Sequence, residues 1–205
     1  MPPQDLVAGR GERKSTPLGT SLFVCLRALD ALLQRYILIS SPFAAILAYI
    51  GLSDPSTTSD GGHPTFSTGL TPFHAVVWRM SVGAAIKQII WILYISNEPM
   101  YPSGSIMICA FNTVFNSINS LLATTNLPYQ YLPQQLYIGQ VLFWVGILVE
   151  LISELQRKSF KDDPANKGKP YAGGLFSLAR SINYGGYTLW RGGYVSNALP
   201  FDVEC

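Results

Sequence analysis

The residues best suited to chemistry lie near the end of the chain, in the run GGLFSLARSINYGGYTLWR at 173–191. A helix over 177–191 would place two arginines and two tyrosines on one face, at i, i+4, i+7 and i+11: Arg180, Tyr184, Tyr187 and Arg191. Guanidinium groups grip phosphate in a fork and a phenol offers a ring and a hydroxyl, so this face suits a charged aromatic ligand. Arginine and tyrosine also anchor membrane helices at the interface. Spacing alone leaves both interpretations open.

A second group of charged residues precedes this run. Glu150, Glu154 and Lys158 follow one another at four-residue steps, acid before base, which predicts ion pairs along a helix. Such pairs would stabilise a helix end at the cytosolic interface, but Glu150 lies deep enough in an apolar run to need a specific partner. The lysines of the following loop, 156–172, are suited to meet an anion such as phosphate.

Polar side chains also interrupt two apolar runs further upstream. Arg79 and Lys87 lie about 80° apart around a helix, so both could face one cavity. Alternatively, Arg79 lies near an interface and Lys87 finds a backbone or carboxylate partner. Asn112, Asn116 and Asn119 form a polar stripe at i, i+4 and i+7. This stripe serves either to hydrogen-bond neighbouring helices or to line a polar ligand cavity.

The elements that must position these residues are long and apolar. Of the 205 residues, 48% are hydrophobic and only 13% are charged, about half the charged share of a soluble domain. A helix needs about 20 apolar residues to cross a bilayer core about 30 Å thick. Four runs suit that length and a fifth is interrupted by glycines: 33–52, 71–96, 104–125, 134–155 and 174–200. We therefore expect an all-α, polytopic integral membrane helical bundle of about five spans.

The distribution of basic residues predicts the orientation of this bundle. Segments 53–69 and 126–133 contain no lysine or arginine, whereas the N-terminal tail and the loop 156–172 are basic. Because basic segments remain in the cytosol, we expect a cytosolic N-terminus. The expected organisation is a mobile cytosolic tail over 1–20 and a single membrane domain over 21–205.

Several classes of partner are not expected. The net charge is only +2, and no basic run has interleaved aromatic residues, so nucleic acid is not a predicted partner. The three cysteines and two histidines are scattered along the chain, which supports neither a disulfide framework nor a metal site.

The order of short motifs from 146 to 194 resembles a known family. A serine–glutamate pair, Ser153 and Glu154, lies near the end of an apolar run, and a basic loop follows. Then come GGLF at 173–176, NYGG at 183–186 and Trp190. In this order the motifs are similar to the C-terminal region of the steroid 5-alpha-reductase family, especially to fungal membrane proteins that share that domain. The wider superfamily includes isoprenylcysteine carboxyl methyltransferases and sterol reductases.

The resemblance implies a cofactor-binding region over 146–194. In reductases of the family, the acid of the serine–acid pair and the asparagine of the N-[FY]-x-G motif contact the nicotinamide cofactor, which carries over to Glu154 and Asn183. Arg180 matches the arginine of the R-H-P-N-Y variant. Three further residues complete the expected set: Glu150 as a ligand-facing acid, Lys158 as a phosphate partner and Arg191 as the last arginine of the stripe. The expected cofactor-binding residues are therefore Glu150, Glu154, Lys158, Arg180, Asn183 and Arg191.

The chain departs from the family pattern in two ways. Ser181 and Ile182 replace the histidine and proline of that variant, and Tyr187 stands where the motif usually continues with an acid. Family members also continue past this point into a further basic and aromatic segment, so the resemblance leaves three alternatives for this chain: a gene model truncated at its C-terminus, a splice product or a degenerate paralogue.

We expect from the resemblance a multi-pass enzyme of the endoplasmic reticulum membrane. It would use NADPH to reduce a carbon–carbon double bond in a sterol, a terpenoid or another lipid-like substrate from the bilayer. Tyr184 or Tyr187 would donate a proton or polarise a carbonyl. The alternatives are an S-adenosylmethionine-dependent methyltransferase of the same superfamily, or a non-catalytic membrane protein whose polar stripes hold helices together.

Overall fold

The chain folds into a bundle of long helices, as the computed structural model shows for residues 15–40, 42, 49, 69–124 and 133–198. The described helices are α1 (Pro17–Ser40), α3 (Pro72–Ile90) continued by a π-helical turn (Trp91–Ile95), α4 (Pro102–Ala123), α5 (Pro133–Asp162), two short 3-10 turns (Pro164–Asn166 and Gly174–Ser177) and α6 (Ile182–Ala198). Three of them are long and apolar enough to cross a membrane: Pro72–Ile95, Pro102–Ala123 and Leu136–Asp162. The expected all-α membrane bundle is confirmed.

Proline fixes where most of these helices begin. A proline at the first helical position has no N–H to leave unpaired and already has a helical φ. Four of the five long helices start this way, at Pro17, Pro72, Pro102 and Pro133. Upstream of α3, the Thr71 hydroxyl also accepts a hydrogen bond from the His74 amide at 3.2 Å, which caps that helix.

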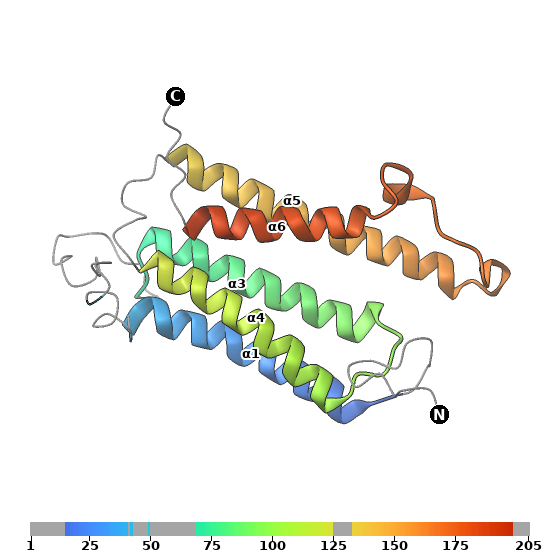
Figure 1. Ribbon diagram of the computed structural model, residues 1–205, viewed down its shortest axis with the longest axis horizontal. Helices are drawn as coiled ribbons and strands as arrows, with labels where there is room; N and C mark the ends of the chain where they lie inside the picture. The colour runs from blue at the N-terminus through green and yellow to red at the C-terminus, as the bar shows by residue number, and fades with distance from the viewer. Residues whose placement is uncertain (1–14, 41, 43–48, 50–68, 125–132, 199–205) are drawn as a thin grey trace.

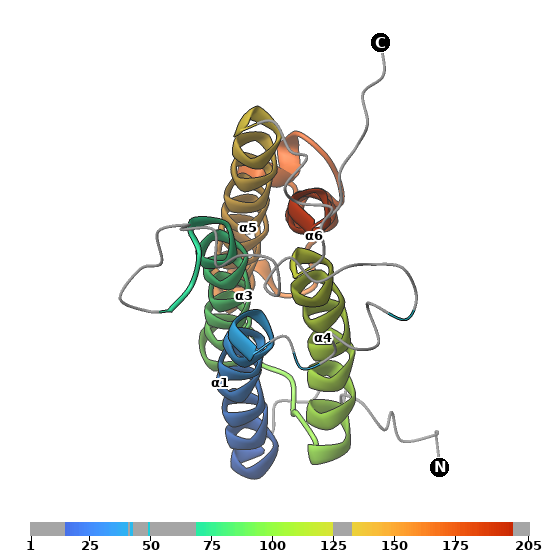
Figure 2. The same ribbon diagram turned by 90° about the vertical axis from the view of Figure 1, so that its left-hand side faces the viewer.

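The helices form two groups that meet at α3 and α4. Helices α5 and α6 pack along each other, and α1 packs against α4 and α3 (Figure 1). The end-on view in Figure 2 shows α3 and α4 between α1 and the α5–α6 pair. Successive helices alternate in direction, so the start of α1, the α3–α4 connection and the α5–α6 connection lie at one end, on the right in Figure 1.

Glycines bring the backbones of α5 and α6 into contact. A Cβ added to Gly146 would lie 2.4 Å from the Trp190 backbone nitrogen, and one added to Gly186 would lie 2.6 Å from that of Glu150. Helices approach this closely in membranes when small residues occupy the interface. The contact sets the register that puts the acids of α5 beside the first turns of α6.

The first helix begins earlier than the hydrophobic run predicted. It starts at Pro17 and not at 33, so residues 17–20 belong to a helix and not to the expected tail. Its charged and amide side chains made this segment look too polar for a span, yet Arg27, Asp30 and Gln34 are all buried. The rest of the expected span, 41–52, lies outside the described residues apart from positions 42 and 49.

These buried groups of α1 are paired with one another and with α4. Arg27 Nη1 donates to Asp30 Oδ2 at 2.9 Å, and Asn116 Nδ2 donates to the same oxygen at 2.8 Å. One turn further, Ser120 Oγ donates to Gln34 Oε1 at 2.7 Å. Because Asn116 and Ser120 belong to α4, a hydropathy scan of α1 alone could not detect these two partners.

The last segment is also shorter than the run 174–200 suggested. A 3-10 turn over Gly174–Ser177 precedes α6, and α6 has 17 residues, fewer than the about 20 that a perpendicular crossing requires.

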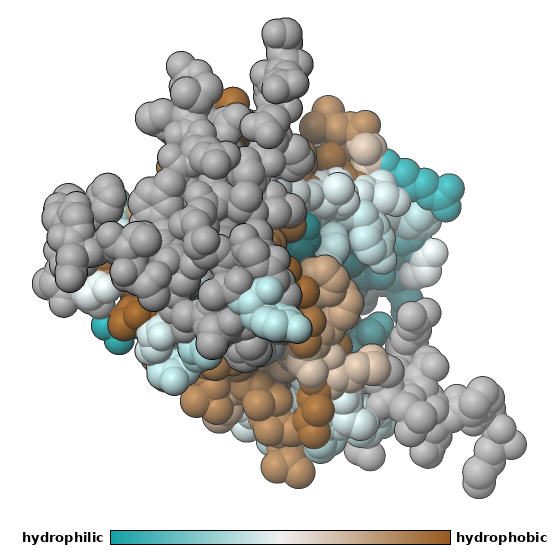
Figure 3. All heavy atoms as spheres, turned by 60° about the vertical axis from the view of Figure 1, so that its left-hand side comes forward, coloured by the Kyte–Doolittle hydropathy of each residue, from teal (hydrophilic) through white to brown (hydrophobic). Residues whose placement is uncertain are grey.

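In the space-filling view, the coloured surface is divided between large brown, hydrophobic areas and a teal, hydrophilic area (Figure 3).

The glycine contact between α5 and α6 can be tested by adding one methyl group. We expect Gly186→Ala to lower the thermal unfolding temperature of the protein in detergent, because its Cβ would press on the α5 backbone and overpacking costs about 1–3 kcal/mol. Gly192→Ala on the same helix is the control: its Cβ has no neighbour within 4 Å, so the unfolding temperature should stay equal or rise. Equal effects of the two substitutions would contradict the close contact.

Candidate functional site

A cavity of about 450 Å³, lined by both charged and apolar side chains, lies where the two groups of helices meet. It is lined by residues from α1, α3 and its π-helical turn, α4, α5 and α6: Phe23, Lys87, Gln88, Trp91, Ile108, Phe111, Asn112, Glu150, Glu154, Arg157, Asn183, Tyr184 and Tyr187. Such a volume falls in the range of about 300–1,000 Å³ that is usual for small-molecule sites. The π-helical turn that starts at Trp91 forms part of its wall, a feature that often occurs at functional sites.

Glu150 is the central group of this cavity. One of its carboxylate oxygens accepts a hydrogen bond from Lys87 Nζ of α3, and the other accepts from Trp190 Nε1 of α6 at 2.6 Å. The Lys87 and Glu150 side chains are only 8% and 14% exposed. The carboxylate on α5 therefore joins three helices through one ion pair and one hydrogen bond. Lys87 is therefore the specific partner that we expected for Glu150 from its position inside an apolar run.

Glu154 lies one helical turn further along α5 and has partners of its own. Its Oε1 accepts from Asn183 Nδ2 of α6 at 2.8 Å, and its Oε2 accepts from Arg157 at 2.5 Å. The acid and the asparagine that the resemblance singles out are therefore hydrogen-bonded to each other.

The GGLF motif lies against the same region of α5. Gln156 Oε1 accepts a hydrogen bond from the Leu175 amide at 2.9 Å, and the Arg157 guanidinium lies 5.8 Å from the Phe176 ring centroid. Gly174 adopts a φ of 53°, and an added Cβ would lie 2.4 Å from Gln156 Oε1. Only glycine suits that backbone and that approach, so the motif holds the connection onto the helix that carries Glu154.

A third cluster closes the cavity on the α4 side. Asn112 Oδ1 accepts hydrogen bonds from Gln88 Nε2 at 2.8 Å and from Arg191 Nη2. The Arg191 guanidinium stacks 4.3 Å from the Trp190 ring centroid and donates from Nε to the Tyr187 hydroxyl at 3.3 Å. Buried Gln88 Oε1 and Arg191 Nη1 have no hydrogen-bond partner within the described residues. A bound ligand or water would satisfy these two groups.

The charges that line the cavity balance one another. Lys87 pairs with Glu150 and Arg157 pairs with Glu154, so two cations face two anions. The remaining walls are aromatic, aliphatic or amide side chains. The cavity can therefore hold a polar aromatic ligand of low net charge without a large mismatch of charge.

The structure brings five of the eight predicted site residues together in this cavity. They are Glu150, Glu154, Asn183, Tyr184 and Tyr187. Arg191 does not line the cavity but bonds to Asn112, which does. Lys158 lines a neighbouring pocket of about 210 Å³ that shares Trp91, Glu154 and Arg157 with the cavity and also contains Lys161.

Two of the expected arrangements are wrong. No ion pair joins Glu154 to Lys158: Glu154 pairs with Arg157, and Lys158 Nζ lies 2.8 Å from Asp162 Oδ2. The stripe that included Arg180 is broken, because α6 begins only at Ile182 and Arg180 lies in the exposed turn before it. Spacing assumed a continuous helix over 177–191, but the 3-10 turn and the following turn interrupt it.

The remaining polar residues divide between structural and cavity positions. Lys87 faces the cavity, whereas Arg79 is exposed and its Nε donates to the Ala75 carbonyl at 3.0 Å. Within the asparagine stripe, Asn112 lines the cavity, while Asn116 hydrogen-bonds to α1 and therefore takes the structural role. Asn119 is buried.

Sequence reasoning missed the aromatic wall of the cavity and the polar pairing of α1. Phe23, Trp91 and Phe111 line the cavity, yet in the sequence they resemble any other apolar residue of a span. The polar residues of α1 did carry a signal, since Arg27, Asp30 and Gln34 stand at i, i+3 and i+7 and so share one helix face.

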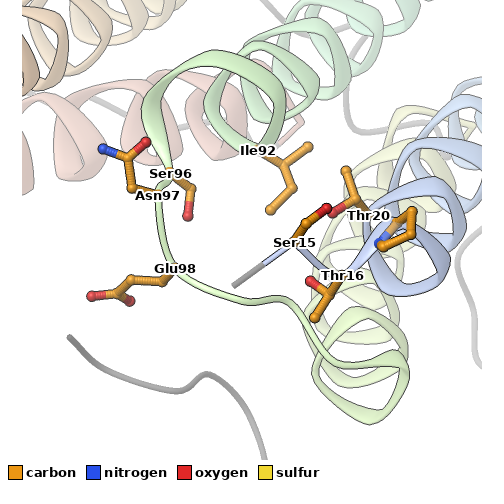
Figure 4. Close-up of a pocket in the computed structure, with 8 residues that line it drawn as sticks. Ser15, Thr16, Thr20, Ile92, Ser96, Asn97 and Glu98 are labelled. Carbon is orange, nitrogen blue, oxygen red and sulfur yellow. The ribbon is translucent and has the colours of Figure 1, made fainter. Parts of the chain in front are cut away.

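A separate hollow of about 430 Å³ lies between the start of α1 and the end of the π-helical turn (Figure 4). It is lined mainly by small polar side chains: Ser15, Thr16, Pro17, Thr20, Ile92, Ser96, Asn97 and Glu98. The Thr16 hydroxyl accepts a hydrogen bond from the Met100 amide at 2.8 Å, which fastens α1 to the α3–α4 connection. None of the predicted site residues lines this hollow, so the cavity around Glu150 remains the candidate site.

Comparison of the sequence with known proteins identifies relatives of this chain. The model of the family described as "Protein of unknown function (DUF1295)" matches residues 105–200, which include the cavity residues of α4, α5 and α6. The chain is also 34% identical over 197 residues to "Probable O-methyltransferase ustE" of Ustilaginoidea virens, a match that covers 90% of this chain and 69% of that protein. No solved structure matches the chain significantly.

Fold, site and comparisons together define a helical membrane protein of the steroid 5-alpha-reductase-like superfamily. The chain belongs to the same family as the fungal protein named as a probable O-methyltransferase, and the DUF1295 model matches its residues 105–200. The expected relation is therefore confirmed at the level of the superfamily.

The role of the Lys87–Glu150 pair in stability can be measured directly. We expect Lys87→Met to destabilise the protein by about 3–5 kcal/mol in thermal unfolding in detergent, because it leaves a buried carboxylate without its cation. The double variant Lys87→Met/Glu150→Gln should recover much of that loss, since glutamine remains an acceptor for Trp190 without a charge.

Lys161→Met is the control for that experiment, since this lysine is exposed on α5, and its effect should lie within about 0.5 kcal/mol. Strictly additive losses in the double variant would show that the two side chains do not interact.

Proposed function

We propose that the protein is an S-adenosylmethionine-dependent O-methyltransferase that acts on a membrane-dissolved, lipid-like substrate. The observation that carries this proposal is the charge-balanced, aromatic-walled cavity around Glu150. The printed name of the fungal relative supports the same chemistry. The family resemblance of the sequence implies a reductase, with a methyltransferase as an alternative.

Charge favours S-adenosylmethionine over a dinucleotide in this cavity. A pyrophosphate needs several cations with free donors, but Lys87 and Arg157 each already bind a glutamate. S-adenosylmethionine combines a sulfonium and an ammonium with a single carboxylate, so two glutamates beside two cations suit it better. The rings of Trp91, Phe111 and Tyr187 would face its adenine or attract its positive sulfur.

Specific residues have the chemistry to hold such a cofactor. The carboxylate of Glu154 would accept hydrogen bonds from an ammonium or from ribose hydroxyls, and Asn183 holds that carboxylate in place. On the α4 side, the Gln88 amide lines the cavity and its Oε1 has no hydrogen-bond partner within the described residues, so it would bind a further polar atom. The aromatic residues of the wall would exclude water from the reacting centre.

The chemistry itself needs one proton acceptor from the protein. When bound, S-adenosylmethionine would supply a methyl group from its positively charged sulfur, and the sulfur would become a neutral thioether. An acceptor hydroxyl would have to lose its proton, and we assign the role of proton acceptor to Glu150, which lines the cavity. Lys87 and Trp190 fix its two oxygens, so the acid is oriented in advance.

A second candidate is the NADPH-dependent reductase of a carbon–carbon double bond. The hydrogen bond between Glu154 and Asn183 favours it, because the resemblance assigns these two residues to the nicotinamide cofactor. The phosphates would extend into the neighbouring pocket, which contains Arg157, Lys158 and Lys161. In that case Tyr184 or Tyr187 would donate the proton.

We further propose that the basic end of the bundle faces the cytosol, in the membrane of the endoplasmic reticulum. The alternating helices place the start of α1 at the same end as the α5–α6 connection, which carries Lys167 and Lys169 (Figure 1). Positive charge retained in the cytosol supports this orientation. A cofactor of the cytosol would then reach the cavity from its own compartment.

Titration of the purified protein with each cofactor distinguishes the candidates. We expect S-adenosylmethionine to quench tryptophan fluorescence saturably through Trp91, with a weaker or absent response to NADPH. The reverse order would support the reductase, and no response to either would leave the non-catalytic interpretation.

Two substitutions then locate the binding site. Asn183→Ala should weaken affinity for S-adenosylmethionine about tenfold, or about 1.4 kcal/mol, because Glu154 loses the group that orients it. Arg180→Ala is the matched control in the same motif: its exposed side chain should leave the affinity unchanged. A tenfold loss for Arg180→Ala with none for Asn183→Ala would contradict the site as described.

A further inference from the structure

The last turn of α5 and the connection that leads to α6 carry an excess of exposed positive charge. Four basic side chains there are exposed and form no ion pair with any residue that the structure describes: Lys161, Lys167, Lys169 and Arg180. Of the two acids within 157–181, Asp162 already pairs with Lys158, so Asp163 alone opposes these four cations. Four cations less one acid leave this basic surface with a net charge of +3.

The connection that carries these cations is folded back onto α5. The Tyr171 ring centroid lies 5.0 Å from that of Phe160 on α5 and 5.5 Å from that of Phe176. Asn166 Nδ2 donates a hydrogen bond to the Phe160 carbonyl oxygen at 3.2 Å. The backbone between the cations is therefore held in one arrangement, which lowers the entropy that a binding partner would otherwise have to offset.

The basic surface begins at the level where the membrane-spanning part of the bundle ends. Lys161 lines the pocket of about 210 Å³ together with Ile95, the last residue of the α3 span. From there the connection returns to the start of α6, at the same end of the bundle as the α3–α4 connection (Figure 1). Phospholipid headgroups occupy this level around the ends of membrane spans.

An exposed apolar side chain accompanies the cations. Leu178 is 76% exposed and lies two residues before Arg180. Segments that lie on a membrane surface combine basic side chains, which meet the headgroups, with apolar side chains, which reach the acyl boundary. An acidic soluble protein would match the charge alone, whereas a lipid leaflet supplies both the negative headgroups and an apolar layer beneath them.

We propose that the basic surface binds anionic phospholipids of the adjoining leaflet through their headgroups. An exposed lysine or arginine beside an anionic membrane surface strengthens association about fivefold. A phosphatidylserine headgroup has a net negative charge and gains from this attraction, whereas the zwitterionic phosphatidylcholine headgroup gains little. The four cations do not line the cavity around Glu150, so this lipid site is separate from the candidate active site.

Fluorescence anisotropy tests the proposal on the purified protein in a neutral detergent. The probe is phosphatidylserine with a fluorescent acyl chain, and phosphatidylcholine with the same chain reports sharing of micelles without headgroup recognition. We expect the phosphatidylserine probe to bind at least about tenfold more tightly, with a preference that shrinks as salt screens the exposed charges. Equal affinities for the two probes, or a preference that salt does not change, would overturn the proposal.

Matched substitutions at two positions separate charge from shape. Lys167→Gln/Lys169→Gln should weaken binding of the phosphatidylserine probe about fivefold or more, because two of the four cations are removed. Lys167→Arg/Lys169→Arg keeps both charges at the same exposed positions and should bind as the unsubstituted protein does. An equal loss in both double variants, or no loss in either, would overturn the basic surface as the site.

Inorganic phosphate distinguishes a lipid headgroup from a free phosphate as the anion that is bound. The pocket lined by Lys158 and Lys161 could accept a phosphate group from either source. Unlabelled phosphatidylserine should displace the probe, whereas inorganic phosphate should not when chloride keeps the ionic strength equal. Displacement by inorganic phosphate alone would overturn the lipid as the ligand and indicate a site for soluble phosphates.

Discussion

The ion pair between Lys87 and Glu150 is the interaction on which the candidate site depends. A charge left alone inside a membrane costs several kcal/mol, and here each charge neutralises the other while Trp190 satisfies the second carboxylate oxygen. The pair joins α3 to α5, and the tryptophan adds α6. Because Lys87 and Glu150 both line the cavity, this contact forms part of the wall that a cofactor would face.

The glycine contacts of α5 and α6 give this pair its geometry. Gly146 and Gly186 let the two backbones touch, which places Trp190 within reach of Glu150 and Asn183 within reach of Glu154. The polar cluster of α1 and α4 holds the other side of the bundle, where Asp30 accepts from both Arg27 and Asn116. Packing of small residues and pairing of buried charges therefore add to the apolar core in holding the helices of this bundle together.

Local pattern predicted the class of fold and the acids of the site, but not their partners. Apolar runs indicated α3, α4 and α5, and motif order indicated Glu154 and Asn183. The predicted start of α1 was wrong because Asp30 and Gln34 make the segment look polar, whereas in the structure both are hydrogen-bonded to residues of α4. Arg180 was misplaced because helical spacing was extended across a turn, and nothing local could indicate that Lys87 would meet Glu150, 63 residues away.

Direct photolabelling by the cofactor tests the central claim that the cavity around Glu150 binds S-adenosylmethionine. The measurement is ultraviolet cross-linking of S-adenosylmethionine, radiolabelled in its methyl group, to the purified protein, followed by peptide mapping. The account predicts that the label falls on peptides containing Trp91, Phe111 or Tyr187 and is abolished by excess unlabelled cofactor. Label that survives this competition, or that lies on helix faces away from the cavity, would contradict it.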